Sequence, residues 1–360
     1  MNTGPYCKAR LRLLHSHLKD AVYLSGLTLH ENASKHWLWR NYRVMLVDGT
    51  TLLMPDTEDN QQAYPQQSVQ KSGLGFPIVR LVGLLSLATG SCVDYVTGPY
   101  QGKGSGETSL FSQLIKSLGN KDLLLADRYY TTYAIMALLL KQGTPLVFRQ
   151  RGNVKSDFRL GQRIGTKDHI ISLKKPKKTP VWMTDMQYSK LPERIFIREF
   201  SVSGTVYVTT LTDAKSPPKV ALAELYQQRW KVELDFRTIK THMGMEMLRC
   251  KSAEMVKKEI AVNLLAYNLV RATMSRAACI NASKPRYLSF MATVQLMCNA
   301  IGLCMAKTGK ALGRLLHSLL FAMTETAIGK RKRPNQPRVV KRRPKAYPMM
   351  TKPREEYITQ

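Results

Sequence analysis

The alternation of short apolar runs with helical patterns between residues 43 and 149 is the feature that most constrains the fold. The expected strands are 43–47, 79–88, 91–100, 122–126 and 145–148, and the expected helices are 107–118 and 131–141. The strand runs are apolar and stop at turn residues, whereas the helical segments repeat apolar residues every three or four positions. The order strand, strand pair, helix, strand, helix, strand predicts a mixed α/β sheet.

The remainder of the chain divides by composition. Short β-rich runs between glycines, prolines and basic clusters predict a β-rich insert, with strands expected at 170–173, 181–184, 194–200 and 205–211. A helical pattern follows, with breaks expected near Gly244, Asn281 and Thr308. The last segment is basic and proline-rich, and we expect it to be disordered without a polyanion. The predicted units are a helical segment at 1–42, the first part of a core at 43–149, the insert at 150–217, the rest of the core with a helical region at 218–328, and a basic arm at 329–360.

The charge of the chain points to a polyanionic partner. Lysine and arginine number 55 against 25 aspartates and glutamates, which gives a net charge of +30. A charge of this size repels itself unless it meets nucleic acid or an anionic membrane surface. No apolar stretch reaches the roughly 18–20 residues of a spanning helix. The first ten residues lack the apolar core of a secretory signal, and the cysteines form no CxxC pair. Membrane-spanning, secreted and zinc-module proteins are therefore disfavoured.

The helix expected after residue 220 gathers reactive side chains on one face. With Tyr226 set at 0° and about 100° per residue, Arg229 falls near −60°, Glu233 near −20°, Arg237 near +20° and Lys240 near −40°. One aromatic hydroxyl, one carboxylate and three cations thus share a stripe. The adjoining stripe is apolar and should face the core; it consists of Leu225, Val232, Phe236 and Ile239. A solvated face with an Arg229–Glu233 pair is the alternative, but it does not account for the tyrosine and the lysine.

Two further carboxylates follow expected strands. Asp48 ends the run 43–47 at an Asp-Gly-Thr turn, and Asp127 follows the run 122–126. Each aspartate alone is typical of a turn or a helix N-cap. At the tips of neighbouring strands, with Glu233 laid against them, they would form a site of hard oxygen ligands, which Mg²⁺ prefers. Two such ions suit the in-line displacement of a phosphodiester.

These motifs resemble those of the IS4-family bacterial transposases, which are DDE enzymes with a ribonuclease-H-like core. The matching segments are Asp48-Gly49-Thr50, Asp127-Arg128-Tyr129-Tyr130, and Tyr-x2-Arg-x3-Glu-x6-Lys from 226 to 240. The resemblance covers roughly residues 6–354, and the long second gap lies where the family carries its insert. It implies a ribonuclease-H-like mixed sheet with an all-β insert and a helical C-terminal region.

The resemblance also implies the chemical roles. Asp48, Asp127 and Glu233 become the catalytic metal ligands, expected to hold two Mg²⁺ ions with Mn²⁺ as a substitute. Tyr226, Arg229 and Lys240 become contacts to phosphates of the transposon end, and Arg237 joins them as a DNA-binding residue of the same stripe.

One tryptophan adds a further expectation. In related enzymes a tryptophan of the insert stacks on a flipped base during hairpin formation. Trp182 is the only tryptophan of this insert and so the candidate. A tryptophan packed between β layers is the alternative.

The implied function is cut-and-paste transposition: metal-dependent cleavage at transposon ends and strand transfer into target DNA. The expected partners are double-stranded DNA of both kinds and a second copy of the chain, without a membrane, in the bacterial cytoplasm at the nucleoid. Family members usually carry a further helical DNA-binding region ahead of the first aspartate, where this chain has 47 residues. Two alternatives therefore stay open: a catalytically silent truncated transposase acting as a DNA-binding remnant or inhibitor, and a sequence-independent Mg²⁺ nuclease.

Overall fold

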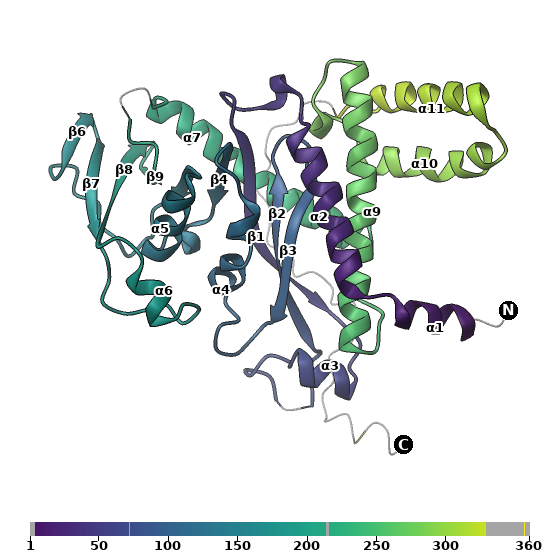
Figure 1. Ribbon diagram of the computed structural model, residues 1–360, viewed down its shortest axis with the longest axis horizontal. Coiled ribbons are helices and arrows are strands. Elements are labelled where there is room, and N and C mark those ends of the chain that lie inside the picture. The colour runs from purple at the N-terminus through teal and green to yellow at the C-terminus, as the bar shows by residue number, and fades with distance from the viewer. Residues whose placement is uncertain (1–3, 72, 214–215, 329–355, 357–360) are drawn as a thin grey trace, which may run out of the picture.

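A nine-stranded mixed sheet runs through the part of the chain that the structure describes (Figure 1). The structure is a computed structural model, and it describes residues 4–71, 73–213, 216–328 and 356. The strand order is β3-β2-β1-β4-β5-β9-β8-β7-β6. The strands are β1 (Arg43–Leu53), β2 (Ile78–Ser86), β3 (Cys92–Pro99), β4 (Asp122–Ala126), β5 (Leu146–Arg149), β6 (Gln162–Gly165), β7 (Asp168–Lys174), β8 (Arg194–Val202) and β9 (Thr205–Thr209).

The first five strands have a ribonuclease-H-like arrangement. β1, β2 and β3 pair antiparallel in succession, as hairpin-connected strands do. β4 and β5 then add in parallel on the other side of β1, each after a helical crossover. The order β3-β2-β1-β4-β5 confirms the predicted mixed α/β fold.

The strands that follow residue 149 extend the same sheet. β9 pairs antiparallel with β5, and β8, β7 and β6 continue outward from it. The strand expected at 181–184 is wrong. These residues lead into a short helix, α6 (Asp185–Ser189), in which the Thr184 side chain accepts from the Gln187 backbone N–H and the Gln187 side chain accepts from the Thr184 backbone N–H. This capping box overrides the β preference of the valine and tryptophan before it.

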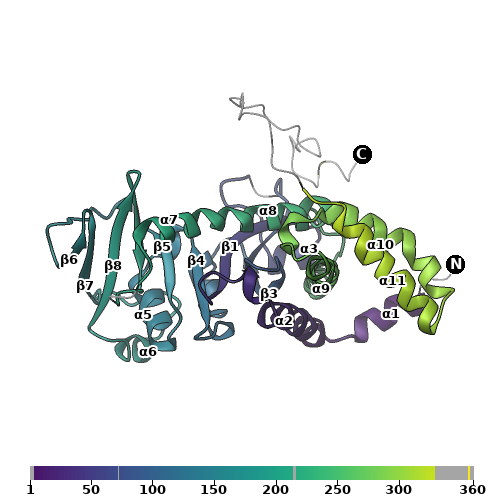
Figure 2. The same ribbon diagram turned by 90° about the horizontal axis from the view of Figure 1, so that it is seen from above.

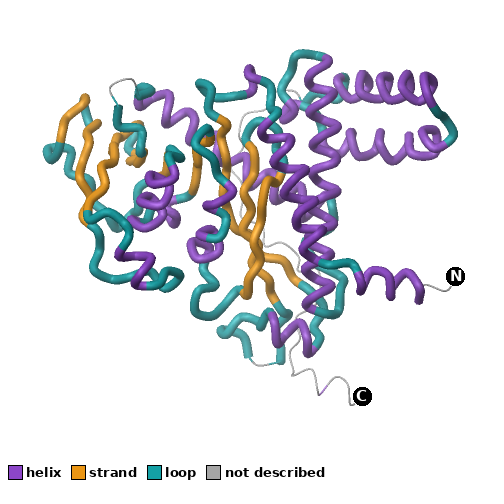
Figure 3. Tube along the Cα trace, viewed as in Figure 1, coloured by secondary structure: helices purple, strands orange, loops and turns teal. Residues whose placement is uncertain are grey.

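Helices cover both faces of the sheet, as Figure 2 shows, whereas α1, α10 and α11 extend away from it beyond α9, as Figure 3 shows. Besides α6, the helices are α1 (Gly4–Arg12), α2 (His15–Glu31), α3 (Glu58–Ala63), α4 (Glu107–Ser112), α5 (Tyr133–Gln142), α7 (Lys219–Gln227), α8 (Lys231–Arg237), α9 (Ala253–Ile280), α10 (Phe290–Met305) and α11 (Gly309–Thr324). The breaks predicted near Gly244, Asn281 and Thr308 are confirmed. No helix of the described ranges is both long and apolar enough to cross a membrane. The predicted basic arm lies outside those ranges apart from residue 356.

Alternation along β1 distributes its side chains between two cores. Val44 and Leu46 pack in the core that α7, α8 and α9 cover, and Met45 and Val47 pack in the core that α4 and α5 cover. Asp48 is next in this alternation, so its side chain belongs to the face of α8. The backbone of β1 therefore directs this aspartate toward the helix that carries Glu233.

A buried ionic cluster fixes α8 against its neighbours. The side chain of Asp235 is 1% exposed, and it accepts from Arg271 of α9 at 2.9 Å and from Arg286 at 2.7 Å. Arg286 also donates to the backbone carbonyls of Ser86 and Leu87, at the end of β2. The cluster thus joins α8, α9 and the sheet on the side of α8 away from Glu233.

Candidate active site

The site lies where β4 ends and β1 continues. The two strands pair in parallel only as far as Leu46 and Leu125. The prediction that the first strand ends at Asp48 is wrong, because β1 keeps pairing with β2 as far as Leu53. Residues 50–53 are β-branched or apolar, and their ladder with β2 outweighs the local turn preference of Asp-Gly. Asp48 therefore lies inside β1, just beyond the last parallel pair.

Arg229 contacts two of the predicted acids, Glu233 on the same helical segment and Asp48, which lies 181 positions away in the sequence. Its Nη1 lies 3.4 Å from Asp48 Oδ2, and its Nη2 donates to Glu233 Oε1 at 2.7 Å. The arginine side chain is 15% exposed, and those of Asp48 and Glu233 are 20% and 35% exposed. The pairing of Arg229 with Glu233 agrees with the helical stripe predicted from the sequence.

Asp127 lies directly after β4, as predicted. Its side chain accepts the backbone N–H of Tyr129 at 3.0 Å and so caps the short 3-10 helix Arg128–Tyr130. Its charge helps to raise the pKa of Tyr226, after burial as the largest cause. The second aspartate is therefore both a cap and a neighbour of the helix that carries the other motif.

The helix that carries the predicted stripe is not a uniform α-helix. Tyr226 is partly buried, with its ring 5.2 Å from that of Tyr207, and burial raises its pKa to about 12. Between α7 and α8 the helix tightens to a 3-10 turn, and after α8 it widens to a π-helix over Thr238–His242. Arg237 is exposed and Lys240 lies in the π-helix, and among the described residues neither forms an ion pair with the three acids. The predicted apolar stripe is confirmed, since all four of its members are buried.

Burial and neighbouring acids disfavour the charged form of Asp48. Burial raises the pKa of Asp48 to about 6, against the N–H of Gly49 and the charge of Arg229, which lower it. Glu107 and Glu233 raise it further. At this pKa the carboxyl is still mostly ionised at pH 7, and a further cation beside it would favour the charged form more strongly.

A fourth carboxylate, which the sequence analysis missed, lies beside the other acids. Glu107 is the first residue of α4, and its carboxylate raises the pKa of Asp48. The pKa of Glu107 is itself raised, chiefly by burial and also by the charge of Asp127. The sequence feature that could have identified Glu107 is its position directly after the glycine-rich stretch 102–106, at the start of the helix between the third and fourth strands. Spacing alone did not show that this helix begins beneath β1.

The donor set fits a divalent metal ion by its chemistry. Carboxylates come from β1, from the end of β4 and from α8, and hard oxygen ligands of this kind suit Mg²⁺. The guanidinium of Arg229 lies between Asp48 and Glu233 and supplies the positive charge these acids need. Within the described ranges no three acidic, histidine or cysteine side chains stand close enough to hold a metal ion as they are.

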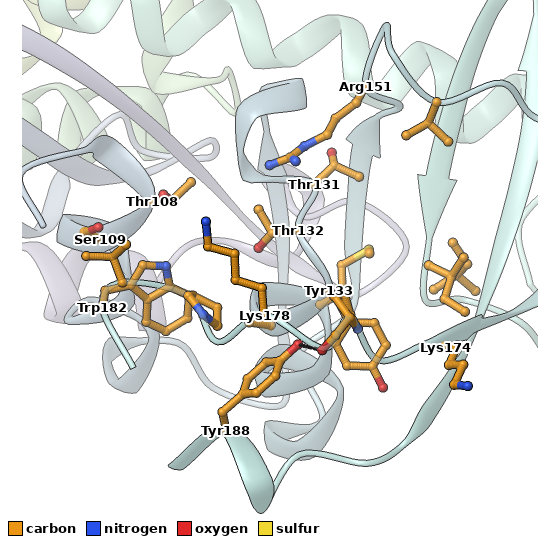
Figure 4. Close-up of a pocket in the computed structure, with 18 of the residues that line it drawn as sticks. Thr108, Ser109, Thr131, Thr132, Tyr133, Arg151, Lys174, Lys178, Trp182 and Tyr188 are labelled. Carbon is orange, nitrogen blue, oxygen red and sulfur yellow. Dashed lines mark hydrogen bonds between the residues drawn. The ribbon is translucent and has the colours of Figure 1, made fainter. Parts of the chain in front are cut away.

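Trp182 lies in the wall of a cleft of about 550 Å³ (Figure 4). Arg151, Lys174 and Lys178 line the same cleft, as do Thr132 and Thr108, the latter directly after Glu107 in the chain. The indole is partly buried and packs against the core of α4 and α5. This packing differs from the alternative considered above, a tryptophan between β layers, and base stacking stays a prediction.

Replacing Asp48 by asparagine should stabilise the metal-free protein. A carboxyl whose pKa is raised on folding destabilises the native state when ionised, so the penalty is present at pH 7 and disappears as pH falls through about 6 toward 4. Removing the charge should add about 1–3 kcal/mol at pH 7.5. Thermal unfolding in a chelator measures this, with Asp20→Asn, exposed on α2, as the control. A lower melting temperature for Asp48→Asn at pH 7.5 would contradict the expectation.

Comparison with known proteins agrees with this geometry. A family profile described as "Transposase DDE domain" matches residues 39–269. The chain is 28% identical over 356 residues to the transposase InsG of insertion sequence element IS4 from Escherichia coli K12, covering 96% of this chain and 78% of that protein. The putative transposase y4zB of Sinorhizobium fredii is 36% identical over 64 residues, 18% of each chain.

A solved structure, the piggyBac transposase synaptic complex with hairpin DNA, aligns with a TM-score of 0.41 and 10% identity, covering 81% of this chain and 59% of that one. The family profile spans the segment that holds β1 with Asp48, the end of β4 followed by Asp127, and α8 with Glu233. This chain therefore belongs to the transposase DDE domain family, as an IS4-family DDE transposase.

Proposed function

We propose that this transposase cleaves DNA at the ends of its element and joins those ends to target DNA, using Asp48, Asp127 and Glu233 as its metal-binding acids. One observation carries the proposal: Arg229 joins Asp48 of β1 to Glu233 of α8, and β4 ends beside them at Asp127. A helix face with this composition was predicted from the sequence, and the acids come from separate elements of the sheet and its cover.

The DDE domains of this family generally use divalent metal ions, and two Mg²⁺ ions are proposed here, with Mn²⁺ as a substitute. When bound, such ions activate an attacking oxygen and stabilise a leaving oxygen. Asp48, Asp127 and Glu233 would hold them. Water and then the DNA 3′-OH would attack, so no covalent bond between protein and DNA forms.

The cationic side chains would hold the DNA. Arg229, Arg237 and Lys240 offer positive charge on the helix that carries Glu233, and Tyr226 offers a hydroxyl near Asp127. Phosphate contacts of this kind orient a duplex without reading its sequence. Double-stranded DNA of the ends and of the target is the proposed partner, bound by two copies of the chain at the nucleoid.

The test is a plasmid that carries the DNA flanking the gene of this chain. Purified protein and Mg²⁺ should cut at the element ends and transfer the liberated 3′ ends to a second plasmid, and a chelator should stop both steps. Sequencing of the junctions distinguishes transposition from the alternatives. Hydrolysis without junctions would indicate a nuclease, and binding without any cut in Mg²⁺ or Mn²⁺ would indicate the catalytically silent DNA-binding protein.

A further inference from the structure

Glu107 reaches the site from the opposite face of β1. Asp48 faces α8, so Gly49, the next residue of the strand, faces the side of α4. A Cβ built on Gly49 would lie 2.6 Å from the Glu107 carboxylate carbon and 2.6 Å from its Oε1. The carboxylate therefore rests against the bare backbone of β1, beside the residue that carries Asp48. Only glycine leaves this space.

Two buried polar atoms face the same carboxylate. The Tyr130 side chain is buried and interacts with Glu107, and the charges of Glu107, Asp48 and Asp127 all act on it. The Tyr130 hydroxyl and the Nε of Arg80 are buried without a well-formed hydrogen bond in the described structure. The charge of Arg80 acts on Glu107 in turn. Both groups can donate to an anion, so the Glu107 carboxylate is their natural partner, and they favour its position beside Gly49.

The open edge of β1 lets acids meet from both faces. β4 ends at Ala126, so the β1 segment that holds Asp48 and Gly49 has no parallel neighbour in the described structure. Glu233 approaches this edge from the face of α8, and Glu107 approaches it from the face of α4.

We propose that Glu107 is a fourth carboxylate ligand of the metal site, acting with Asp48 and Asp127. The inference rests on the proposed function, because it adds a ligand to the same site. Tyr130 and Arg80 hold the Glu107 side chain in place, and Gly49 leaves it room.

Manganese binding tests the assignment without depending on cleavage. The full chain is titrated with Mn²⁺ in the absence of DNA, and free Mn²⁺ is measured by electron paramagnetic resonance. Glu107→Gln should weaken binding about tenfold or more, as should Asp127→Asn. Glu193→Gln is the matched control, since that side chain is 77% exposed and pairs only with Lys175 among the described residues. It should bind as the wild type does.

A second variant keeps every acid. Gly49→Ala places a methyl group where the Glu107 carboxylate lies, so it should reproduce the weaker Mn²⁺ binding of Glu107→Gln. Circular dichroism and thermal unfolding of each variant confirm that it is folded. If Asp127→Asn weakens binding while Glu107→Gln and Gly49→Ala bind normally, the role of Glu107 is overturned and the proposed function stands. If all of these variants bind as the wild type does, the proposed metal site fails as a whole.

Discussion

Glu233→Gln should lower DNA cleavage at least about 1,000-fold, which corresponds to about 4 kcal/mol of transition-state stabilisation. Glutamine keeps the size of the side chain and can still accept from Arg229, now held at 2.7 Å. It carries no charge, so it is a poor ligand for a hard divalent cation. The loss should appear in the rate of the chemical step, measured by single-turnover cleavage of a labelled end in Mg²⁺.

DNA binding should change less than about twofold in the same variant, because the cations proposed to contact phosphates are retained. Glu224→Gln is the matched control: it removes an exposed carboxylate from α7, at the far side of the same helical stretch. That variant should cut as the wild type does. Cleavage by Glu233→Gln at an undiminished rate would reject the assignment of this residue.

Asp235→Ala should destabilise the fold by about 3–5 kcal/mol, although this aspartate is two residues from Glu233. The substitution leaves the guanidinium groups of Arg271 and Arg286 buried without their carboxylate, and those side chains are only 6% and 9% exposed. The ion pair as a whole need not stabilise the protein, but an unpaired buried charge costs far more than an exposed one. Urea unfolding followed by circular dichroism measures the change.

The matched control for Asp235 is a surface pair of the same chemistry. Asp157 contacts Arg159 at 2.7 Å, and the arginine side chain is 88% exposed. Pairs of this kind contribute little in water, so Asp157→Ala should leave the unfolding midpoint unchanged. An equal effect of the two substitutions would show that burial of the Asp235 cluster does not decide its energetics.

Much of the site could be predicted because its signals are local. The spacing of Arg229 and Glu233 on a helix predicts their contact, and the strand before Asp127 predicts where that aspartate lies. A strand's length depends on its partner as well as on its own residues. This is why the Asp-Gly pair of β1 suggested a turn, whereas the ladder with β2 continues to Leu53.

Other parts of the site depend on contacts that no sequence window contains. Glu107 reaches the acids because α4 packs beneath Gly49, and the two strands that lie between them in sequence, β2 and β3, carry no sign of this. The 3-10 turn before α8 and the π-helix after it are departures from α-helical geometry that residue spacing does not indicate. Regular helical spacing predicted the contact of Glu233 with Arg229, and the DNA-binding roles of Arg237 and Lys240 stay predictions.

The continuity of the sheet has a mechanical consequence. β5 comes after Asp127 in the chain, and β9 comes after residue 149. Backbone pairing from Val147 to Arg149 joins the two strands. A unit on a flexible linker can reorient on its substrate, whereas a strand within a hydrogen-bonded ladder turns only with its neighbours. We therefore expect the outer strands and the edge that holds the acids to move together. If Lys174 or Lys178 binds a DNA duplex, the twist of the sheet would set the orientation of that duplex relative to the acids.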